Sequence, residues 1–124
     1  MERDPMIVAG IGYRSGATPA DLEAALALTG VTPDALASLD GKSGGPLTAL
    51  ANTLNLPLTP LTEDQIAGTR TLTCSPRIKA RFATGSLAEA CALVAAGPNA
   101  RLTHPRVIGP CGRVTVAIAE GSTP

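Results

Sequence analysis

The sequence has almost no aromatic residues, and this scarcity restricts the ligands that it can hold. Only Tyr13 and Phe82 are aromatic among 124 residues, so the core must be built from leucine, valine, isoleucine and alanine. Single-stranded nucleic acids bind where successive bases stack on aromatic side chains, and this chain lacks such platforms. It also lacks the basic domain and recognition helix of a duplex DNA-binding protein. Nucleic acid is therefore not expected as a partner.

Cysteine and histidine are also scarce. The three cysteines, Cys74, Cys91 and Cys111, form no CxxC pair, so neither a disulfide framework nor a structural zinc site is predicted. His104 is the only histidine, and no Cys, His or Asp stands at ligand spacing from it, so its expected role is structural. This cysteine usage is typical of a reducing cytoplasm. No metal or cofactor is predicted.

Long apolar segments are missing as well. No hydrophobic run approaches the roughly 20 residues of a membrane-spanning helix, so no membrane partner is expected. The N-terminal sequence MERDP lacks the basic and apolar regions of a signal peptide. The chain is therefore expected to be cytoplasmic. Its length predicts a single domain over residues 1–124, with flexible ends at 1–5 and 121–124.

Charge is balanced overall but divided along the chain. The formal net charge is +0 at pH 7, yet most acidic side chains precede residue 65. Between Gln65 and Arg113 the only acid is Glu89, and the bases are Arg70, Arg77, Lys79, Arg81, Arg101, Arg106 and Arg113. Arg77, Lys79 and Arg81 alternate, so an extended conformation would place them on one face. That face is either simply solvated or a clamp for an anionic ligand.

The hydrophobic pattern predicts five strands. The apolar run at 6–12 predicts a buried and central first strand, because both of its faces are covered. Alternating β-branched residues predict the last strand at 113–119, and a turn at 109–112 joins it to the strand before it. Prolines indicate an edge position for 57–61 and a break in 100–107. The remaining strand, at 36–40, carries the weakest signal.

Helix starts are marked by capping residues and prolines. Helices are predicted to begin near Thr18, Pro46, Thr62 and Ser86, and a shorter helical turn is predicted at 32–34. Strands and helices alternate along most of the chain. The predicted fold is therefore α/β: a single-domain layered sandwich, with a mixed β-sheet, flanking helices and a C-terminal β-hairpin.

A glycine-marked turn follows the first predicted strand. Its candidate ligand-binding residues are Gly10, Gly12, Arg14, Ser15 and Gly16. The turn is not a dinucleotide-binding fingerprint, because Gly16 comes one residue late for the third glycine. Two interpretations remain open. The glycines either form a tight strand-to-loop connection or expose backbone N–H groups to a carboxylate, with Arg14 and Ser15 adding donors.

A second turn precedes the helix that begins near Ser86. Its candidate ligand-binding residues are Thr84, Gly85, Ser86 and Glu89. Ser86 and Glu89 have the spacing of a capping box, which explains them structurally without any ligand. A capped helix start still presents N–H groups and a positive dipole to an anion, so both roles can coexist.

Four stretches, taken in order, resemble one known family. They are VAGIGYRSG at 8–16, SLDGK at 38–42, TGSLAEACALVAAG at 84–97 and VTVAIA at 114–119. Together they resemble the CobE/CbiG C-terminal domain family of cobalamin (vitamin B12) biosynthesis proteins over nearly the whole chain. The chain departs from the family pattern after Lys42, where a longer acidic stretch is usual, and at 104–106, where the family often carries lysine.

The resemblance implies a role in building the corrin ring, with a precorrin or corrin intermediate as ligand. Precorrins carry a rim of acetate and propionate carboxylates, which cationic side chains and backbone N–H groups complement. One function in line with the family is a tetrapyrrole-binding carrier or accessory protein. The alternative is a precorrin-5A-type lactone hydrolase that releases acetaldehyde, as the resemblance to CbiG implies. A small anion-binding module without a pathway role is a third interpretation.

For a hydrolase, the matched SLDGK stretch supplies the candidate catalytic residues Asp40 and Lys42. Asp40 would orient the attacking water and Lys42 would stabilise the oxyanion, although the two also suit a surface ion pair. In a cobalt pathway His104 would suffice as an axial ligand to cobalt already held by a corrin. Other cobalamin-pathway enzymes are candidate partners, and a homodimer is left open.

Overall fold

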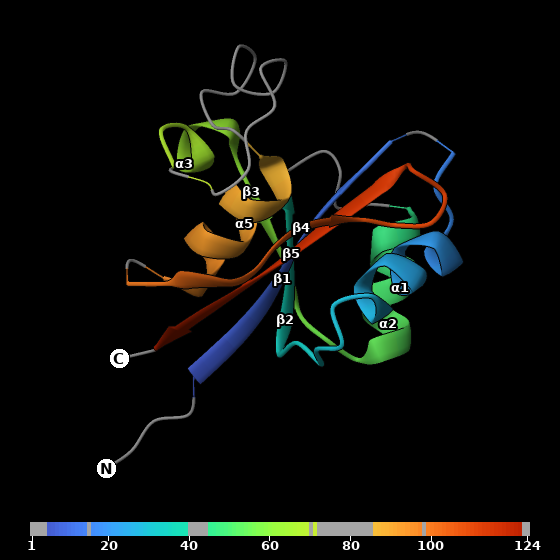
Figure 1. Ribbon diagram of the computed structural model, residues 1–124, viewed down its shortest axis with the longest axis horizontal. Coiled ribbons are helices and arrows are strands. Elements are labelled where there is room, and N and C mark those ends of the chain that lie inside the picture. The colour runs from blue at the N-terminus through green and yellow to red at the C-terminus, as the bar shows by residue number, and fades with distance from the viewer. Residues whose placement is uncertain are drawn as a thin grey trace.

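The computed structural model describes residues 5–14, 16–39, 45–69, 71, 86–97 and 99–122. Five strands form one sheet in the order β3-β2-β1-β5-β4, and helices cover both of its faces (Figure 1). The strands are β1 (Pro5–Tyr13), β2 (Ala35–Leu39), β3 (Leu58–Leu61), β4 (Arg101–Ile108) and β5 (Val114–Ser122). The described helices are α1 (Pro19–Ala27), α2 (Pro46–Leu54), α3 (Glu63–Ile66) and α5 (Leu87–Ala96). The predicted α/β fold is confirmed.

The sheet is mixed, and β1 lies at its centre as predicted. β1 pairs parallel with β2, and β2 pairs parallel with β3. On its other side β1 pairs antiparallel with β5 along its whole length, from Pro5↔Ser122 to Tyr13↔Val114. β5 pairs antiparallel with β4, which confirms the C-terminal hairpin. The carboxyl ends of β1 and β2 therefore meet at one edge, together with the start of β5.

Local sequence signals place two of the helix starts. Thr18 accepts a hydrogen bond from the Asp21 N–H at 3.1 Å, and the Asp21 carboxylate accepts from the Thr18 N–H at 3.0 Å. The same reciprocal pair joins Thr62 and Gln65 at the start of α3. These capping boxes satisfy N–H groups that a helix start leaves without intrahelical partners.

The helical turn predicted at 32–34 is wrong. Residues 31–33 form an irregular segment that leads straight into β2. Asp34 is hydrogen-bonded to β1 instead. Its carboxylate accepts from the Ile7 N–H at 2.9 Å, and its own N–H donates to the Ile7 carbonyl at 2.7 Å. A tertiary pairing with β1 has overridden the local helix signal.

The core divides into two clusters, one on each face of the sheet. Along β1 the side chains alternate, with Ala9 and Ile11 facing α1 and α2 and Val8 facing α5. Alanines predominate on α5, and Cys91 is among them in the core. Among the described residues, no helix is long and apolar enough to cross a membrane.

Two glycines let α5 lie directly on the sheet. A Cβ atom built on Gly10 would overlap the Ala88 carbonyl oxygen and stand 2.7 Å from the Ala92 nitrogen. One built on Gly121 would overlap the Ala96 carbonyl oxygen in the same way. The helix backbone thus contacts the backbones of β1 and β5, which fixes the N-terminus of α5 relative to the end of β1.

Candidate functional site

A cavity of about 360 Å³ opens beyond the N-terminus of α5. Gly10 is covered by the first turns of α5, and Gly12, two residues further along β1 on the same face, lines the cavity. Thr115, paired with Gly12 on β5, lines it beside Gly12. The full described lining is Gly12, Tyr13, Arg14, Ser86, Leu87, Arg106, Ile108, Gly112, Arg113 and Thr115.

Three arginines from separate segments line this cavity, which we call the arginine pocket. Arg14 follows β1, Arg113 precedes β5, and Arg106 belongs to β4. The Arg14 N–H donates to the Arg113 carbonyl at 2.8 Å, which extends the β1–β5 ladder and holds these two backbones side by side. No acidic residue stands among the described residues that line the pocket.

The described lining of the pocket therefore carries positive charge and no negative charge. Guanidinium groups stay protonated under all ordinary conditions. Burial raises the pKa of Tyr13 above its usual value of 10.0, so the phenol adds no negative charge at neutral pH. Arg14 and Arg113 are exposed and Arg106 is half-buried, so all three can reach a ligand that enters from solvent. Guanidinium groups bind carboxylates through paired, charge-assisted hydrogen bonds.

The first turn of α5 adds to this positive potential. Ser86 is buried, lines the pocket, and accepts from the Glu89 N–H at 3.4 Å as the helix cap. The N-terminal end of a helix carries a partial positive charge from its unsatisfied N–H groups. The structure therefore brings Ser86 together with Gly12 and Arg14, three of the residues that the sequence indicated.

The lining of the pocket leaves little room for a side chain at position 12. A Cβ atom built on Gly12 would stand 3.0 Å from the Thr115 Oγ1, which donates to the Gly12 carbonyl at 3.4 Å. Gly16 has φ +92°, a conformation that glycine adopts without strain, and it lies next to the Arg113 guanidinium. Gly16 is exposed and does not itself line the pocket.

Gly10 and Glu89 do not lie where they could contact a ligand in the pocket. Gly10 is buried under α5, so its role in this structure is helix packing. Glu89 is 0% exposed, and its carboxylate accepts from the Arg106 N–H at 2.8 Å. Neither residue lines the pocket.

Of the remaining sequence-based candidates, the structure describes only His104. Eight of them fall outside the described residues: Ser15, Asp40, Lys42, Arg77, Lys79, Arg81, Thr84 and Gly85. His104 lies in β4, half-buried, with its Nδ1 3.1 Å from the Thr103 Oγ1. It does not line the pocket, and the described part of the chain holds no cluster of three or more potential metal ligands.

Sequence reasoning did not place Arg106 and Arg113 in the site. Both belong to the cationic second half of the chain, but composition alone does not show where they converge. Arg113 could have been found from the hairpin, because a strand that pairs with β1 over its full length brings its first residue to the end of β1. No sequence signal shows the position of Arg106, which depends on a contact between β4 and α5.

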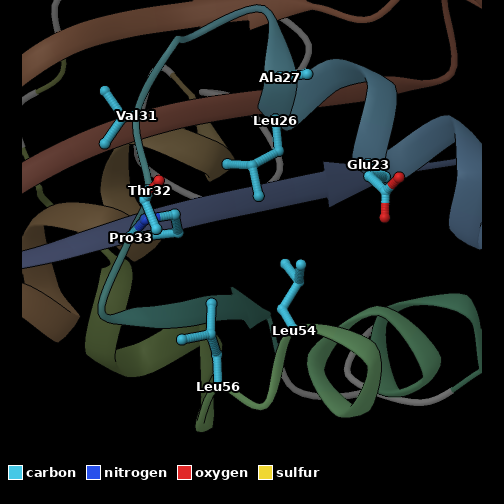
Figure 2. A pocket seen from close by; sticks show the side chains of 8 residues that line it. All are labelled: Glu23, Leu26, Ala27, Val31, Thr32, Pro33, Leu54 and Leu56. Atoms are coloured by element: carbon cyan, nitrogen blue, oxygen red, sulfur yellow. The ribbon is translucent and has the colours of Figure 1, made fainter.

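A second cavity, of about 230 Å³, has a different chemical character (Figure 2). It lies between α1, the segment after α1 and the end of α2. Its lining includes the apolar side chains of Leu26, Val31, Pro33, Leu54 and Leu56. Among the described residues of that lining Glu23 is the only charged one, and its carboxylate would repel an anion. Of these two cavities, the arginine pocket is therefore the one that an acidic ligand favours.

Comparisons with known proteins agree with this fold. The family model described as the C-terminus of cobalamin synthesis protein G matches residues 7–119. The structure resembles that of CobE, described as a protein from the cobalamin (vitamin B12) biosynthetic pathway. The TM-score is 0.80 and the identity 31%, over 94% of this chain and 93% of that one.

It also resembles the cobalamin biosynthesis protein chiG from Agrobacterium tumefaciens, with a TM-score of 0.70 and 35% identity. That match covers 95% of this chain and 100% of the other. No significant match exists among the curated proteins. The family match spans nearly the whole chain and agrees with the order of the sequence motifs. The chain therefore belongs to the CbiG C-terminal family and is a protein of cobalamin biosynthesis.

Proposed function

We propose that the protein binds a precorrin or corrin intermediate at the arginine pocket and acts as a tetrapyrrole carrier or accessory protein. One observation carries the proposal: Arg14, Arg106 and Arg113 converge on one cavity whose described lining contains no acid. Precorrins present several carboxylates on flexible arms around a ring. Several guanidinium groups at one place suit such a rim better than they suit a single carboxylate.

Apolar side chains at the same place suit the ring itself. Leu87 and Ile108 line the pocket beside the arginines, and Ile108 is 58% exposed. A large apolar side chain left exposed at a charged cavity favours a ligand with an apolar face and an acidic edge. A cavity of about 360 Å³ accommodates one edge of a tetrapyrrole rather than the whole macrocycle.

Cobyrinic acid, a corrin polycarboxylate, tests this proposal by titration calorimetry or by its visible spectrum. Its fully methylated ester is the matched control ligand, because it keeps the ring and removes the negative charges. We expect the acid to bind and the ester to bind much more weakly. An ester that binds as tightly as the acid would show that the arginines do not recognise carboxylates.

A matched pair of variants locates the binding site. Arg113→Gln removes one guanidinium of the pocket, and we expect it to weaken binding of cobyrinic acid by about tenfold. Arg101→Gln is the control, because Arg101 is an exposed arginine at the other end of β4, outside the pocket lining. Equal losses in both variants would refute a site at the arginine pocket.

The second candidate function is the lactone hydrolase, and one observation favours it. β2 ends at Leu39, so Asp40 directly follows the carboxyl end of a parallel strand next to β1. In α/β sheets, ligands bind outside the carboxyl ends of the strands. Incubation with a cobalt-precorrin-5A substrate, followed by an assay for acetaldehyde, tests this function. Turnover that is lost in Asp40→Asn supports the hydrolase, whereas binding without acetaldehyde release supports the carrier.

The cellular location and the protein partners are part of the same proposal. A cytoplasmic location agrees with a biosynthetic role and with a set of three cysteines, which is too few and uneven for a disulfide framework. Other cobalamin-pathway enzymes are the expected protein partners, because an intermediate that is carried must be received and delivered. Homodimerisation is tested by sedimentation of the purified protein.

A further inference from the structure

β4 is not a regular strand at the position of Arg106. His104 pairs with Ile118, and Val107 pairs with Val116. From His104 to Val107 the chain advances by three residues along β4, while the paired segment of β5 advances by two. β4 therefore carries one extra residue within 105–106. Such a β-bulge bends the strand and changes the direction of the side chains around it.

A hydrogen bond to α5 holds the bulge. Pro105 has no N–H, so the first donor within the bulge is the Arg106 N–H. This N–H donates to the Glu89 carboxylate at 2.8 Å. Glu89 is 0% exposed and lies in the first turn of α5, whose place on the sheet is fixed by the contact at Gly10. Hydrogen bonds to a buried carboxylate are among the stronger ones in proteins.

The residue that Glu89 holds is also the one whose side chain lines the pocket. Arg106 and Val107 are both half-buried, although the preceding residues of β4 alternate between exposed and half-buried. Val107 packs against the core cluster of α1 and α2, on the opposite face from α5. The bulge therefore lies where β4 turns Val107 toward the core of α1 and α2 and Arg106 toward the pocket.

We propose that Glu89 is a positioning residue: by holding the β4 bulge at the Arg106 N–H, it directs the Arg106 guanidinium into the arginine pocket. The proposal rests on the proposed function for its consequence in binding, but the position of Arg106 can be measured without any ligand. It also gives the Glu89 of the predicted capping box a role that does not require contact with the ligand.

Two variants of Glu89 separate this role from ordinary helix stability. Glu89→Gln keeps the shape and an oxygen acceptor, whereas Glu89→Met keeps the approximate size and removes the acceptor. In protein labelled with ¹⁵N-arginine, we expect Glu89→Met to shift the Nε–H signal of Arg106 and to leave those of Arg14 and Arg113 in place. Glu89→Gln should restore most of the original Arg106 signal. An unchanged Arg106 signal in Glu89→Met would overturn the proposal, whether or not the protein binds corrinoids.

Binding of cobyrinic acid supplies the second measurement. Glu89→Met and Arg106→Gln should each weaken binding by about tenfold, and the double variant should be no weaker than Arg106→Gln alone. Losses that multiply in the double variant would show that Glu89 acts independently of Arg106 and would refute the positioning role. No binding by the unmodified protein would refute the proposed function, while the arginine spectrum would still decide the role of Glu89.

If Glu89→Met does not fold, deletion of Pro105 tests the role of the bulge without changing Glu89. The deletion removes the extra residue within 105–106 and puts Arg106 in a different register with β5. We expect the Arg106 signal to shift and the affinity to fall by about tenfold. A deletion variant that keeps both would show that the bulge does not direct Arg106.

Discussion

Close packing decides what single residues can be in this protein. Helix α5 contacts the sheet through backbone atoms at Gly10 and Gly121, so these positions have no room for even a methyl group. Other glycines have open space around them and are required only by their backbone conformation. Gly30 is one of these, with φ +69° and no atom within 4 Å of an added Cβ. The two kinds of glycine predict different costs on substitution.

We expect Gly10→Ala to destabilise the protein much more than Gly30→Ala. The added methyl at position 10 would overlap the Ala88 carbonyl and force α5 away from β1, at a cost of about 3 kcal/mol or more. At position 30 the cost is the left-handed conformation alone, about 1 kcal/mol. Urea unfolding of the two variants measures both values. Equal costs would mean that α5 does not lie as close to β1 as described.

Burial also makes two cysteines chemically distinct. Cys91 is buried in the α5 core, and desolvation raises the pKa of its thiol from 9.0 to about 12. Cys111 is exposed, and its Sγ accepts from the Arg113 N–H at 3.3 Å. At pH 8 we expect iodoacetamide to alkylate Cys111 readily and Cys91 only on unfolding. Mass spectrometry of tryptic peptides distinguishes them, and rapid alkylation of Cys91 in the folded protein would contradict its burial.

The same pKa shift predicts a loss of stability at alkaline pH. Because the folded pKa is above the unfolded value, the neutral thiol is favoured in the folded state, and its contribution is complete below pH 9. As pH rises from 9 toward 12 the unfolded chain loses this proton first, so stability falls, by up to about 4 kcal/mol. Denaturant unfolding of wild type and Cys91→Ala measures the effect as a difference. A constant difference across this range would contradict it.

At the scale of secondary structure, local signals were reliable where the element depends on its own residues. The helices predicted to begin near Thr18 and Thr62 formed, because a capping box at each start satisfies N–H groups within one helical turn. The turn predicted at 32–34 did not form, because Asp34 pairs with Ile7, which is distant in sequence. A proline indicated the irregularity of β4, but the hydrogen bond that holds it could not be predicted for the same reason, since its partner Glu89 lies in another element. Tertiary contacts decided what sequence patterns could not.

A pair of threonines tests this difference between a true and a false helix start. Thr18→Ala removes the cap of α1 and should cost about 1 kcal/mol of unfolding free energy. Thr32 precedes Pro33 in a similar sequence but is exposed and starts no helix, so Thr32→Ala should cost less than about 0.5 kcal/mol. Thermal or urea unfolding compares them. A larger loss at Thr32 than at Thr18 would contradict the assigned start of α1.

At the scale of the whole molecule, the fold brings arginines that are far apart in the sequence together at one cavity. The cationic residues Arg106 and Arg113 of the hairpin meet Arg14, which comes from the acidic first half. The sequence predicted a cationic site and placed Gly12, Arg14 and Ser86 in it. It could not predict this set of arginines, because their convergence depends on the antiparallel pairing of β5 with β1 and on the bulge of β4. A cluster of like charges whose described lining contains no acid adds nothing to folding, which favours a role in binding.

The convergence of charge predicts a strong dependence of binding on ionic strength. Two of the three guanidinium groups are exposed, so salt screens their attraction to carboxylates, with a Debye length of about 10 Å at 0.1 M and about 3 Å at 1 M. We expect the affinity for cobyrinic acid to fall steeply over this range, and less steeply in Arg14→Gln/Arg113→Gln, which starts from weaker binding. Because removal of these charges also relieves their mutual repulsion, the double variant should unfold at the same or a higher urea concentration. An affinity that does not change with salt would mean that the ring, rather than its acidic rim, is what the protein recognises.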